Sequence, residues 1–380
     1  MPRGNRLTGA LSALLLALAA TACVPAAPVP ATAAPTKPAA PVAPAPSPAA
    51  PAASPAASPG ASPAAAPKPA AKEAVKVAHA PSTLFAPLYV AIDKGYLADQ
   101  GIEVQLETVA AGQDAMALTA QGQLDAVVAG FGAATFNAVE RGLDLKVVSS
   151  MGVQPQQGFP SAFMVRKDLL QSGAVKEMKD LKGKKVAIAG GNGSARAYWV
   201  ATKLETGGLA LKDVDIVNLA FPDMVTGFKQ GSIDAAFPPA PFTTQITQEG
   251  TAEVFGGVTK PGASAVGTVY GGQFIKDRPD VGRRLMLGLV KGARDLQGQD
   301  YYKPEHIAIY SKYTKVPVET LQTIDRYDFF PDLHPDVATL TDMQRIFIAE
   351  GVLKIPAPLP PERWADESFT KYADEQLGRK

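Results

Sequence analysis

Small polar residues gather in two short loops of this chain, and each loop is followed by a helix pattern. The two loops contain Ser82, Thr83 and Phe85 in the first and Asn192, Gly193 and Ser194 in the second. Hydroxyl and amide groups beside the N–H groups of a helix N-terminus favour an anionic ligand. Neither loop contains Asp, Glu or His, so a buried cation would find no counter-charge there. The two loops therefore predict a site for an anion.

Arg196 lies two residues into the helix pattern after the second loop. Its guanidinium could add a charge-assisted contact to an anion, and the alternative is a helix residue that faces solvent. Four aromatic side chains in or near the loops could stack on an apolar ligand, or could belong to the core instead: Phe85, Phe131, Tyr198 and Phe242. These residues favour a small organic anion with some apolar surface.

The first loop is positioned by a strand before it and a helix after it. Leu88, Ile92 and Tyr96 fall on one face of a helix, and Gly101 is placed to end that helix. The alternating apolar residues of 102–106 predict a second strand. In such βαβ units a ligand binds beyond the carboxyl ends of the strands.

The chain repeats this organisation at an offset of 109 residues. KVAHA at 76–80 matches KVAIA at 185–189, and QGQLDA at 121–126 matches QGSIDA at 230–235. Two copies of a β-α-β-α-β unit predict an α/β protein of two lobes, each a mainly parallel sheet flanked by helices. Two further loops would then face the site, one with Gly130 and Phe131 and one at 238–242. Asp125 and Asp234, paired by the repeat, are expected to cap local turns. From about residue 280 onward, helices at 281–296, 337–350 and 364–377 are expected to pack on the first lobe.

Composition divides the chain into segments. Residues 1–22 carry Arg3 and Arg6 before an apolar run, which is typical of a signal peptide, and Cys23 follows directly. The pattern resembles a bacterial lipoprotein signal in which Cys23 is lipidated, and the alternative is ordinary cleavage beside an incidental cysteine. Residues 23–73 are mostly Ala, Pro and Ser and predict a disordered linker. The expected lobes are 74–160 with 268–380 and, for the second, 161–267, with a hinge at the two crossings.

Several classes of function are excluded by composition. Lys and Arg number 37 against 36 Asp and Glu, and no basic patch is interleaved with aromatic residues, so nucleic acid is not an expected partner. The single cysteine lies outside the expected lobes, which leaves no cysteine catalysis or disulfide there. The spacing of His79, His306 and His334 suits no metal site. Neither a metal nor a cofactor is expected.

Four segments in order resemble the nitrate, sulfonate and taurine type of substrate-binding protein of ABC importers, a superfamily that includes binders of a thiamine pyrimidine precursor. The segments are 87–107 (PLYVAIDKGYLADQGIEVQLE), 122–130 (GQLDAVVAG), 181–194 (LKGKKVAIAGGNGS) and 231–242 (GSIDAAFPPAPF). The resemblance covers about 75–292 and implies a type II periplasmic-binding-protein fold whose lobes close on a ligand. The family's ligand contacts would fall on Ser82, Thr83, Phe85, Gly130, Phe131, Asn192, Gly193 and Ser194. Many relatives have an acidic residue before the proline of the fourth loop, where this chain has Ala240.

The resemblance also implies a place and partners for the protein. It would be an exported, lipid-anchored monomer on the outer face of the cytoplasmic membrane, in a periplasm or at a cell surface. It would deliver a small molecule to an ABC permease and its ATPase, and would not be an enzyme. Two alternatives remain: a superfamily enzyme of the pyrimidine-synthase or desulfinase type, and a sensory receptor that works with a membrane kinase.

Overall fold

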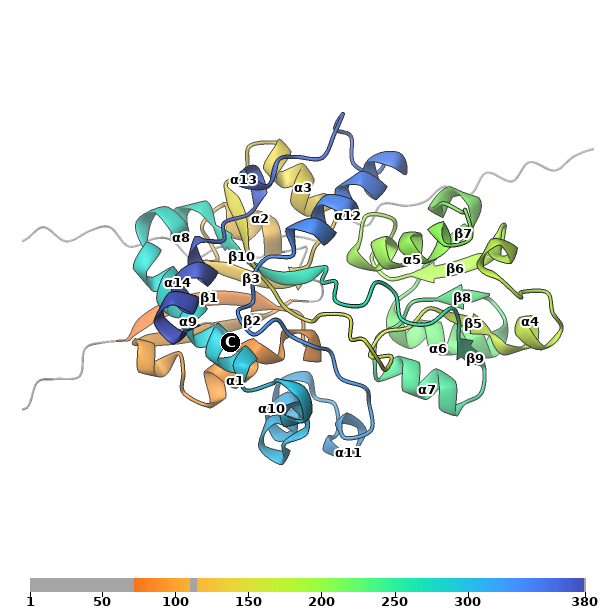
Figure 1. Ribbon diagram of the computed structural model, residues 1–380, viewed down its shortest axis with the longest axis horizontal. Helices are drawn as coiled ribbons and strands as arrows, with labels where there is room; N and C mark the ends of the chain where they lie inside the picture. The colour runs from red at the N-terminus through yellow and green to blue at the C-terminus, as the bar shows by residue number, and fades with distance from the viewer. Residues whose placement is uncertain (1–71, 110–114, 379–380) are drawn as a thin grey trace, which may run out of the picture. The chain divides into compact units, whose positions relative to one another are not determined.

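Two five-stranded sheets flanked by helices make up the part of the chain that the computed structural model describes, residues 72–109 and 115–378 (Figure 1). The expected signal peptide at 1–22, Cys23 and nearly all of the expected linker lie outside the described residues. The linker was expected to extend to residue 73, whereas the first strand already begins at Glu73.

The first sheet has the strand order β2-β1-β3-β10-β4. Its strands are β1 (Glu73–His79), β2 (Ile102–Thr108), β3 (Ala126–Gly130), β4 (Leu145–Ser150) and β10 (Val266–Gly271). Strand β1 runs parallel to β2 and β3, whereas β10 runs antiparallel to β3 and β4. The connecting helices are α1 (Ala86–Asp93), α2 (Ala115–Ala120) and α3 (Ala133–Glu140).

The second sheet repeats this arrangement with the order β7-β6-β8-β5-β9. Its strands are β5 (Met164–Arg166), β6 (Lys185–Ile188), β7 (Asp215–Asn218), β8 (Ala235–Ala236) and β9 (Ala252–Val254), and its helices are α4 (Lys167–Gln171), α5 (Ala195–Glu205), α6 (Phe221–Gln230) and α7 (Phe242–Gln248). Strand β5 runs antiparallel to both of its neighbours. In each sheet the reversed strand belongs to a crossing between the sheets, so the predicted two-lobe α/β fold is confirmed.

Asp125 and Asp234 occupy the same position in the two sheets. The Oδ2 atom of Asp125 accepts a hydrogen bond from the backbone N–H of Lys76 at 2.8 Å, and that of Asp234 accepts one from Lys185 at 2.9 Å. The expectation that each aspartate caps its own turn is wrong, because each carboxylate bonds to a backbone N–H of the neighbouring strand. The repeat seen in the sequence is therefore also a repeat of contacts.

The C-terminal region is helical. Its helices are α8 (Gly272–Asp277), α9 (Pro279–Arg294), α10 (Pro304–Thr314), α11 (Val318–Leu321), α12 (Val337–Ala349), α13 (Pro361–Trp364) and α14 (Ser368–Leu377). The helix expected at 364–377 is split into α13 and α14, because Ala365 has an extended backbone. Helix α9 packs on α1 and α14, whereas α12 contacts both α3 and α5 and so does not pack on the first lobe alone as expected.

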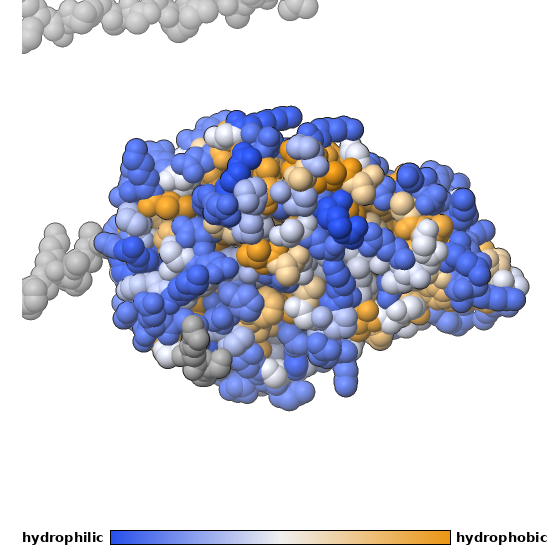
Figure 2. Space-filling model, turned by 45° about the horizontal axis from the view of Figure 1, so that its top comes forward, coloured by the Kyte–Doolittle hydropathy of each residue, from blue (hydrophilic) through white to orange (hydrophobic). Residues whose placement is uncertain are grey.

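The surface of the described residues is largely hydrophilic on the face drawn in Figure 2. Its exposed large hydrophobic side chains are Leu118, Leu143 and Val318, which come from separate parts of the chain. None of the helices in residues 72–109 and 115–378 combines the length and the apolar composition needed to cross a membrane.

Candidate ligand-binding site

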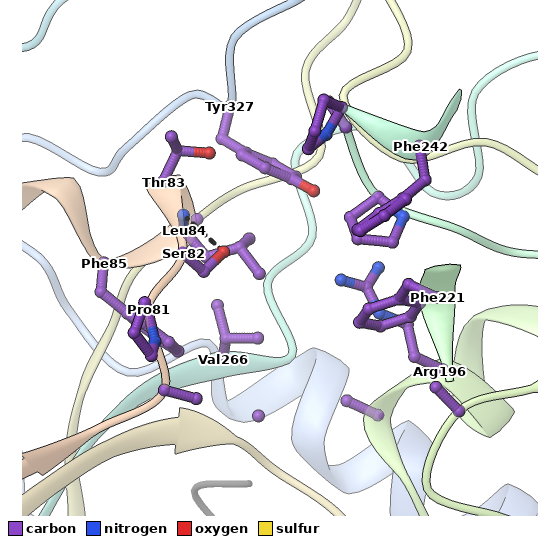
Figure 3. Close-up of a pocket in the computed structure, with 18 of the residues that line it drawn as sticks. Pro81, Ser82, Thr83, Leu84, Phe85, Arg196, Phe221, Phe242, Val266 and Tyr327 are labelled. Atoms are coloured by element: carbon purple, nitrogen blue, oxygen red, sulfur yellow. Dashed lines mark hydrogen bonds between the residues drawn. The ribbon is translucent and has the colours of Figure 1, made fainter. Parts of the chain in front are cut away.

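A cavity of about 790 Å³ opens at the carboxyl ends of strands from both sheets. Residues from all four predicted loops line it: 80–85 after β1, Gly130 at the end of β3, 189–190 and 194–196 after β6, and 239–242 after β8. Figure 3 shows Ser82–Phe85 on one side of this space and Arg196, Phe221 and Phe242 on the other. The position agrees with the general rule that ligands of α/β sheets bind beyond the strand ends.

A buried tyrosine, Tyr89, forms a hydrogen bond to the loop after β1. The Oγ of Ser82 accepts a hydrogen bond from the N–H of Leu84, which caps the short 3-10 helix Thr83–Phe85. The N–H of Ser82 donates to the Oη of Tyr89 at 3.3 Å, and that oxygen also lies 2.9 Å from Nδ1 of His79. Burial lowers the pKa of His79, so its imidazole is neutral at pH 7. The loop thus has a fixed backbone and uncharged support.

Arg196 supplies the cavity's positive charge. Among the described lining residues it alone carries a formal charge at neutral pH. Its Nη1 donates to the Oγ of Ser161 at 2.9 Å, and its Cζ lies 5.4 Å and 5.9 Å from the ring centroids of Phe221 and Phe237. Arg196 forms no ion pair with any residue in the described ranges. A partly buried guanidinium without a carboxylate partner favours an anion from outside the chain.

Ser194 contributes to the cavity wall, but its hydroxyl is already engaged. The Oγ donates toward the carbonyls of Ala189 and Gly191, each at 2.9 Å, and accepts the N–H of Ala197 as the N-cap of α5. At the start of α3, the N–H of Ala133 donates to the carbonyl of Gly193 at 2.8 Å. Serine oxygens thus occupy the N–H of Ala197 in α5 and the N–H of Leu84 after the first loop, and binding of an anion by the other N–H groups of these two helix ends stays a prediction.

The predicted site residues divide into two groups. Those that line the cavity are Ser82, Thr83, Phe85, Gly130, Ser194, Arg196 and Phe242, and those outside the lining are Phe131, Asn192, Gly193 and Tyr198. Phe131 and Tyr198 are fully buried in the core. Because Tyr198 is two residues from Arg196 on a helix, the two side chains point in different directions, and Tyr198 bonds to Asp342 instead. Whether the lining residues touch a ligand stays a prediction.

Other lining residues were not predicted from the sequence. Asn218 is the last residue of β7 and Phe221 begins the next helix, so the strand-end rule applied to β7 would have found them. Gln154 and Tyr327 lie outside the repeat, where the sequence gives no such signal. The side chain of Gln154 is only 4% exposed, and its Oε1 has no hydrogen-bond partner among the described residues.

Metal binding has no support in the described ranges, which contain no group of three or more His, Cys, Asp or Glu side chains placed to hold an ion. The functional groups of the lining are a guanidinium, hydroxyls and amides. Such groups bind and orient a ligand.

Comparisons with known proteins identify the family and the fold. The family model described as NMT1/THI5 like matches residues 82–297. The riboflavin-binding protein RibY of Chloroflexus aurantiacus is 31% identical over 148 residues, which are 38% of this chain and 39% of that protein. The chain thus matches well under half of the length of this relative.

Solved structures of similar fold include both binding proteins and an enzyme. The nitrate-binding protein NrtA of Synechocystis PCC 6803 has a TM-score of 0.66 at 15% identity, covering 81% of this chain and 89% of its own. The alkanesulfonate-binding protein SsuA of Xanthomonas axonopodis pv. citri, bound to MOPS, has a TM-score of 0.60 at 18% identity. The match covers 77% of this chain and 98% of that protein. The desulfurization enzyme DSZB has a TM-score of 0.53 at 16% identity, and the match covers 80% of this chain and 99% of that enzyme. At these identities the likeness concerns the fold.

Proposed function

Because the chain belongs to the NMT1/THI5 like family, we propose that it is a solute receptor that binds a small organic anion between its two lobes. The observation that carries the proposal is the guanidinium of Arg196, which lies in the cavity wall and has no carboxylate partner among the described residues. An anionic group of the ligand would supply that partner.

The cavity also supports an apolar part of the ligand. Its volume of about 790 Å³ exceeds what an inorganic oxyanion fills, and cavities of roughly 300–1,000 Å³ hold drug-sized molecules. Aromatic side chains that line it are Phe85, Trp199, Phe221, Phe242 and Tyr327. One relative is named riboflavin-binding and another alkanesulfonate-binding, which supports an organic ligand. The ligand class that follows is an organic anion, such as a sulfonate or a carboxylate, with an apolar or aromatic body.

The proposed role is delivery of this ligand to an ABC permease and its ATPase by an exported monomer. Two lobes would close on the ligand, one at 74–160 with 268–380 and one at 161–267, although β10 of the first sheet already begins at Val266. Lipidation of Cys23 after removal of residues 1–22, with 23–73 as a linker, would anchor the receptor at the outer face of the cytoplasmic membrane.

An enzyme is the alternative that a specific observation favours, because the desulfurization enzyme DSZB shares the fold. The guanidinium, hydroxyls and amides of the lining favour binding over proton transfer. A sensory receptor would use the same cavity, and it differs only in the membrane partner that co-purifies with it.

Native mass spectrometry of the full chain, freshly purified without denaturation, tests the proposal. We expect a retained organic anion that is released intact on denaturation, and we expect the Arg196→Met variant to lose it. Wild-type protein that retains a neutral or cationic molecule would contradict the anion assignment. A bound molecule that the protein converts to another compound would favour the enzyme.

A further inference from the structure

Three polar side chains at the wall of the cavity form one hydrogen-bonded row. The Nη1 of Arg196 donates to the Oγ of Ser161 at 2.9 Å, and this Oγ lies 2.6 Å from the Oη of Tyr327. The Oη of Tyr327 in turn lies 3.0 Å from the carbonyl oxygen of Pro160. In Figure 3 the hydroxyl end of Tyr327 and the guanidinium of Arg196 point toward the same space.

The direction of each hydrogen bond in this row follows from counting protons. The carbonyl of Pro160 can only accept, so the single proton of the Tyr327 hydroxyl goes to it. Ser161 must then donate its own proton to the Oη of Tyr327. A lone pair of the Ser161 oxygen is left facing Arg196, whose N–H groups can only donate. Each bond polarises the next, so the serine oxygen is a strong acceptor for the guanidinium.

The row joins three parts of the chain that are far apart in sequence. Arg196 is in α5, Ser161 is in the first crossing between the sheets, and Tyr327 is in the segment between α11 and α12. Ser161 and Tyr327 are each 2% exposed, and their neighbourhoods are fixed by the backbone bridges Ser161–Pro239 and Val153–Asp328. Backbone contacts beside Ser161 and Tyr327 therefore hold two members of the row in place.

The guanidinium held by this row keeps most of its donors for a ligand. It has five N–H groups, and Ser161 is its one hydrogen-bond partner in the described ranges. The rings of Phe221 and Phe237 pack near Cζ and restrict its movement. An arginine that is already held at one corner loses less conformational freedom when it binds an anion.

We propose that Ser161 and Tyr327 are positioning residues that hold Arg196 ready for the ligand's anionic group, and thereby determine selectivity for an anion over a neutral molecule of the same shape. The proposal rests on the proposed function. It assigns the selectivity to two residues that the ligand itself need not touch.

The first test follows Arg196 in the ligand-free full chain by ¹⁵N NMR of arginine side chains. The Arg196→Lys variant assigns the Arg196 signal by its loss. In the wild-type protein we expect separate Nη signals from restricted rotation, and in Ser161→Ala and Tyr327→Phe we expect these signals to average. Controls are Ser149→Ala and Tyr310→Phe, which remove buried hydroxyls that bond away from Arg196. Unchanged Arg196 signals in both test variants would overturn the proposal.

The second test is calorimetric titration with benzenesulfonate and with benzenesulfonamide, its neutral analogue. Ser161→Ala and Tyr327→Phe should each weaken benzenesulfonate binding about tenfold and leave benzenesulfonamide binding within about twofold. The double variant should bind benzenesulfonate about as tightly as the weaker-binding of the two single variants, because both substitutions interrupt the same hydrogen-bonded row. An equal loss for both compounds would mean a structural role and overturn the proposal. If wild-type protein bound no organic anion, the proposed function would fail, whereas the NMR result would still decide whether the row positions Arg196.

Discussion

The hydroxyl of Tyr198 lies 3.0 Å from Oδ2 of Asp342, which joins helix α5 of the second sheet to helix α12 of the C-terminal region. Lys260 bonds to both groups, and Arg345 of α12 reaches Glu205 of α5 at 3.1 Å. Helix α5 also carries Arg196 in its first turn. Any movement of the second sheet must therefore carry α12 with it or break this set of contacts.

Replacing Asp342 tests whether these contacts restrain α5. Asp342→Ala should speed amide hydrogen exchange in α5, because Tyr198, Lys260 and Arg345 lose their shared acceptor. Removing one partner of such a partly buried network costs about 1–3 kcal/mol. Asp280→Ala removes an exposed ion pair with Arg283 and should leave α5 unchanged. Identical exchange in α5 of the Asp342 variant and the wild type would show that α12 does not restrain it.

The folding stability should depend on pH through His79, which supports the loop of Ser82. Its folded pKa is lowered by burial, so the unfolded chain takes up a proton first as the pH falls below about 6.5. The contribution is therefore complete above that pH and is lost as the pH falls toward the folded pKa.

Urea unfolding of the wild type and His79→Gln between pH 5 and 8 measures this contribution. As the pH falls, the unfolding free energy of His79→Gln should decrease less than that of the wild type. His334 has the opposite shift, a pKa raised by its hydrogen bond to Asp332, but it is present in both proteins and cancels in the comparison. Parallel pH profiles for the two proteins would rule out a neutral, buried His79.

Gln154 should lower the unfolding free energy of the ligand-free protein. Its Oε1 is buried without a partner in the described residues, and an unsatisfied buried group costs about 1–3 kcal/mol. Gln154→Met should therefore raise the unfolding free energy by about 1 kcal/mol in urea titrations.

The matched control for this change is Gln344→Met. Gln344 is also buried, but its Oε1 accepts the N–H of Leu359 at 2.8 Å, so its replacement should destabilise the protein. If both methionine variants were destabilised alike, Gln154 would have a satisfied amide after all.

Asp125 and Asp234 can be tested against each other, because they occupy equivalent positions in the two sheets. Asp125→Asn and Asp234→Asn should each lower the unfolding free energy by about 1–2 kcal/mol, because each carboxylate accepts from a strand N–H and also lies beside an arginine. Similar losses in urea unfolding would support equivalent roles. A loss at one position alone would break the equivalence of the two sheets.

Much of the fold was predictable because its signals are local in sequence. The helix and strand periods, together with the repeated KVA and Gly-x-x-Asp-Ala patterns, identify parallel strands, and the ends of parallel strands locate the four loops. Arg196 follows from its place at the start of a helix, and the same helical spacing would have excluded Tyr198.

The rest of the site depends on contacts between distant segments. Ser161 meets Tyr327 across 166 residues, and Asp342 meets Tyr198 across 144 residues. Neither Tyr327 nor Gln154 lies in the repeat, and no periodicity or motif marks them. The hydrogen bond from Ala133, at the start of α3, to Gly193 also has no signal in the sequence, because it depends on how the two sheets face each other.

Calorimetric titration of the wild type, Arg196→Lys and Arg196→Met with benzenesulfonate and benzenesulfonamide tests most directly whether Arg196 binds the ligand's anionic group. Arg196→Met should weaken benzenesulfonate binding by about a hundredfold and barely change benzenesulfonamide binding, because a charge-assisted hydrogen bond is lost only for the anion. Arg196→Lys should fall between, since it keeps the charge without the planar fork. Benzenesulfonate binding that is equally strong in the wild type and Arg196→Met would contradict an anion site at Arg196.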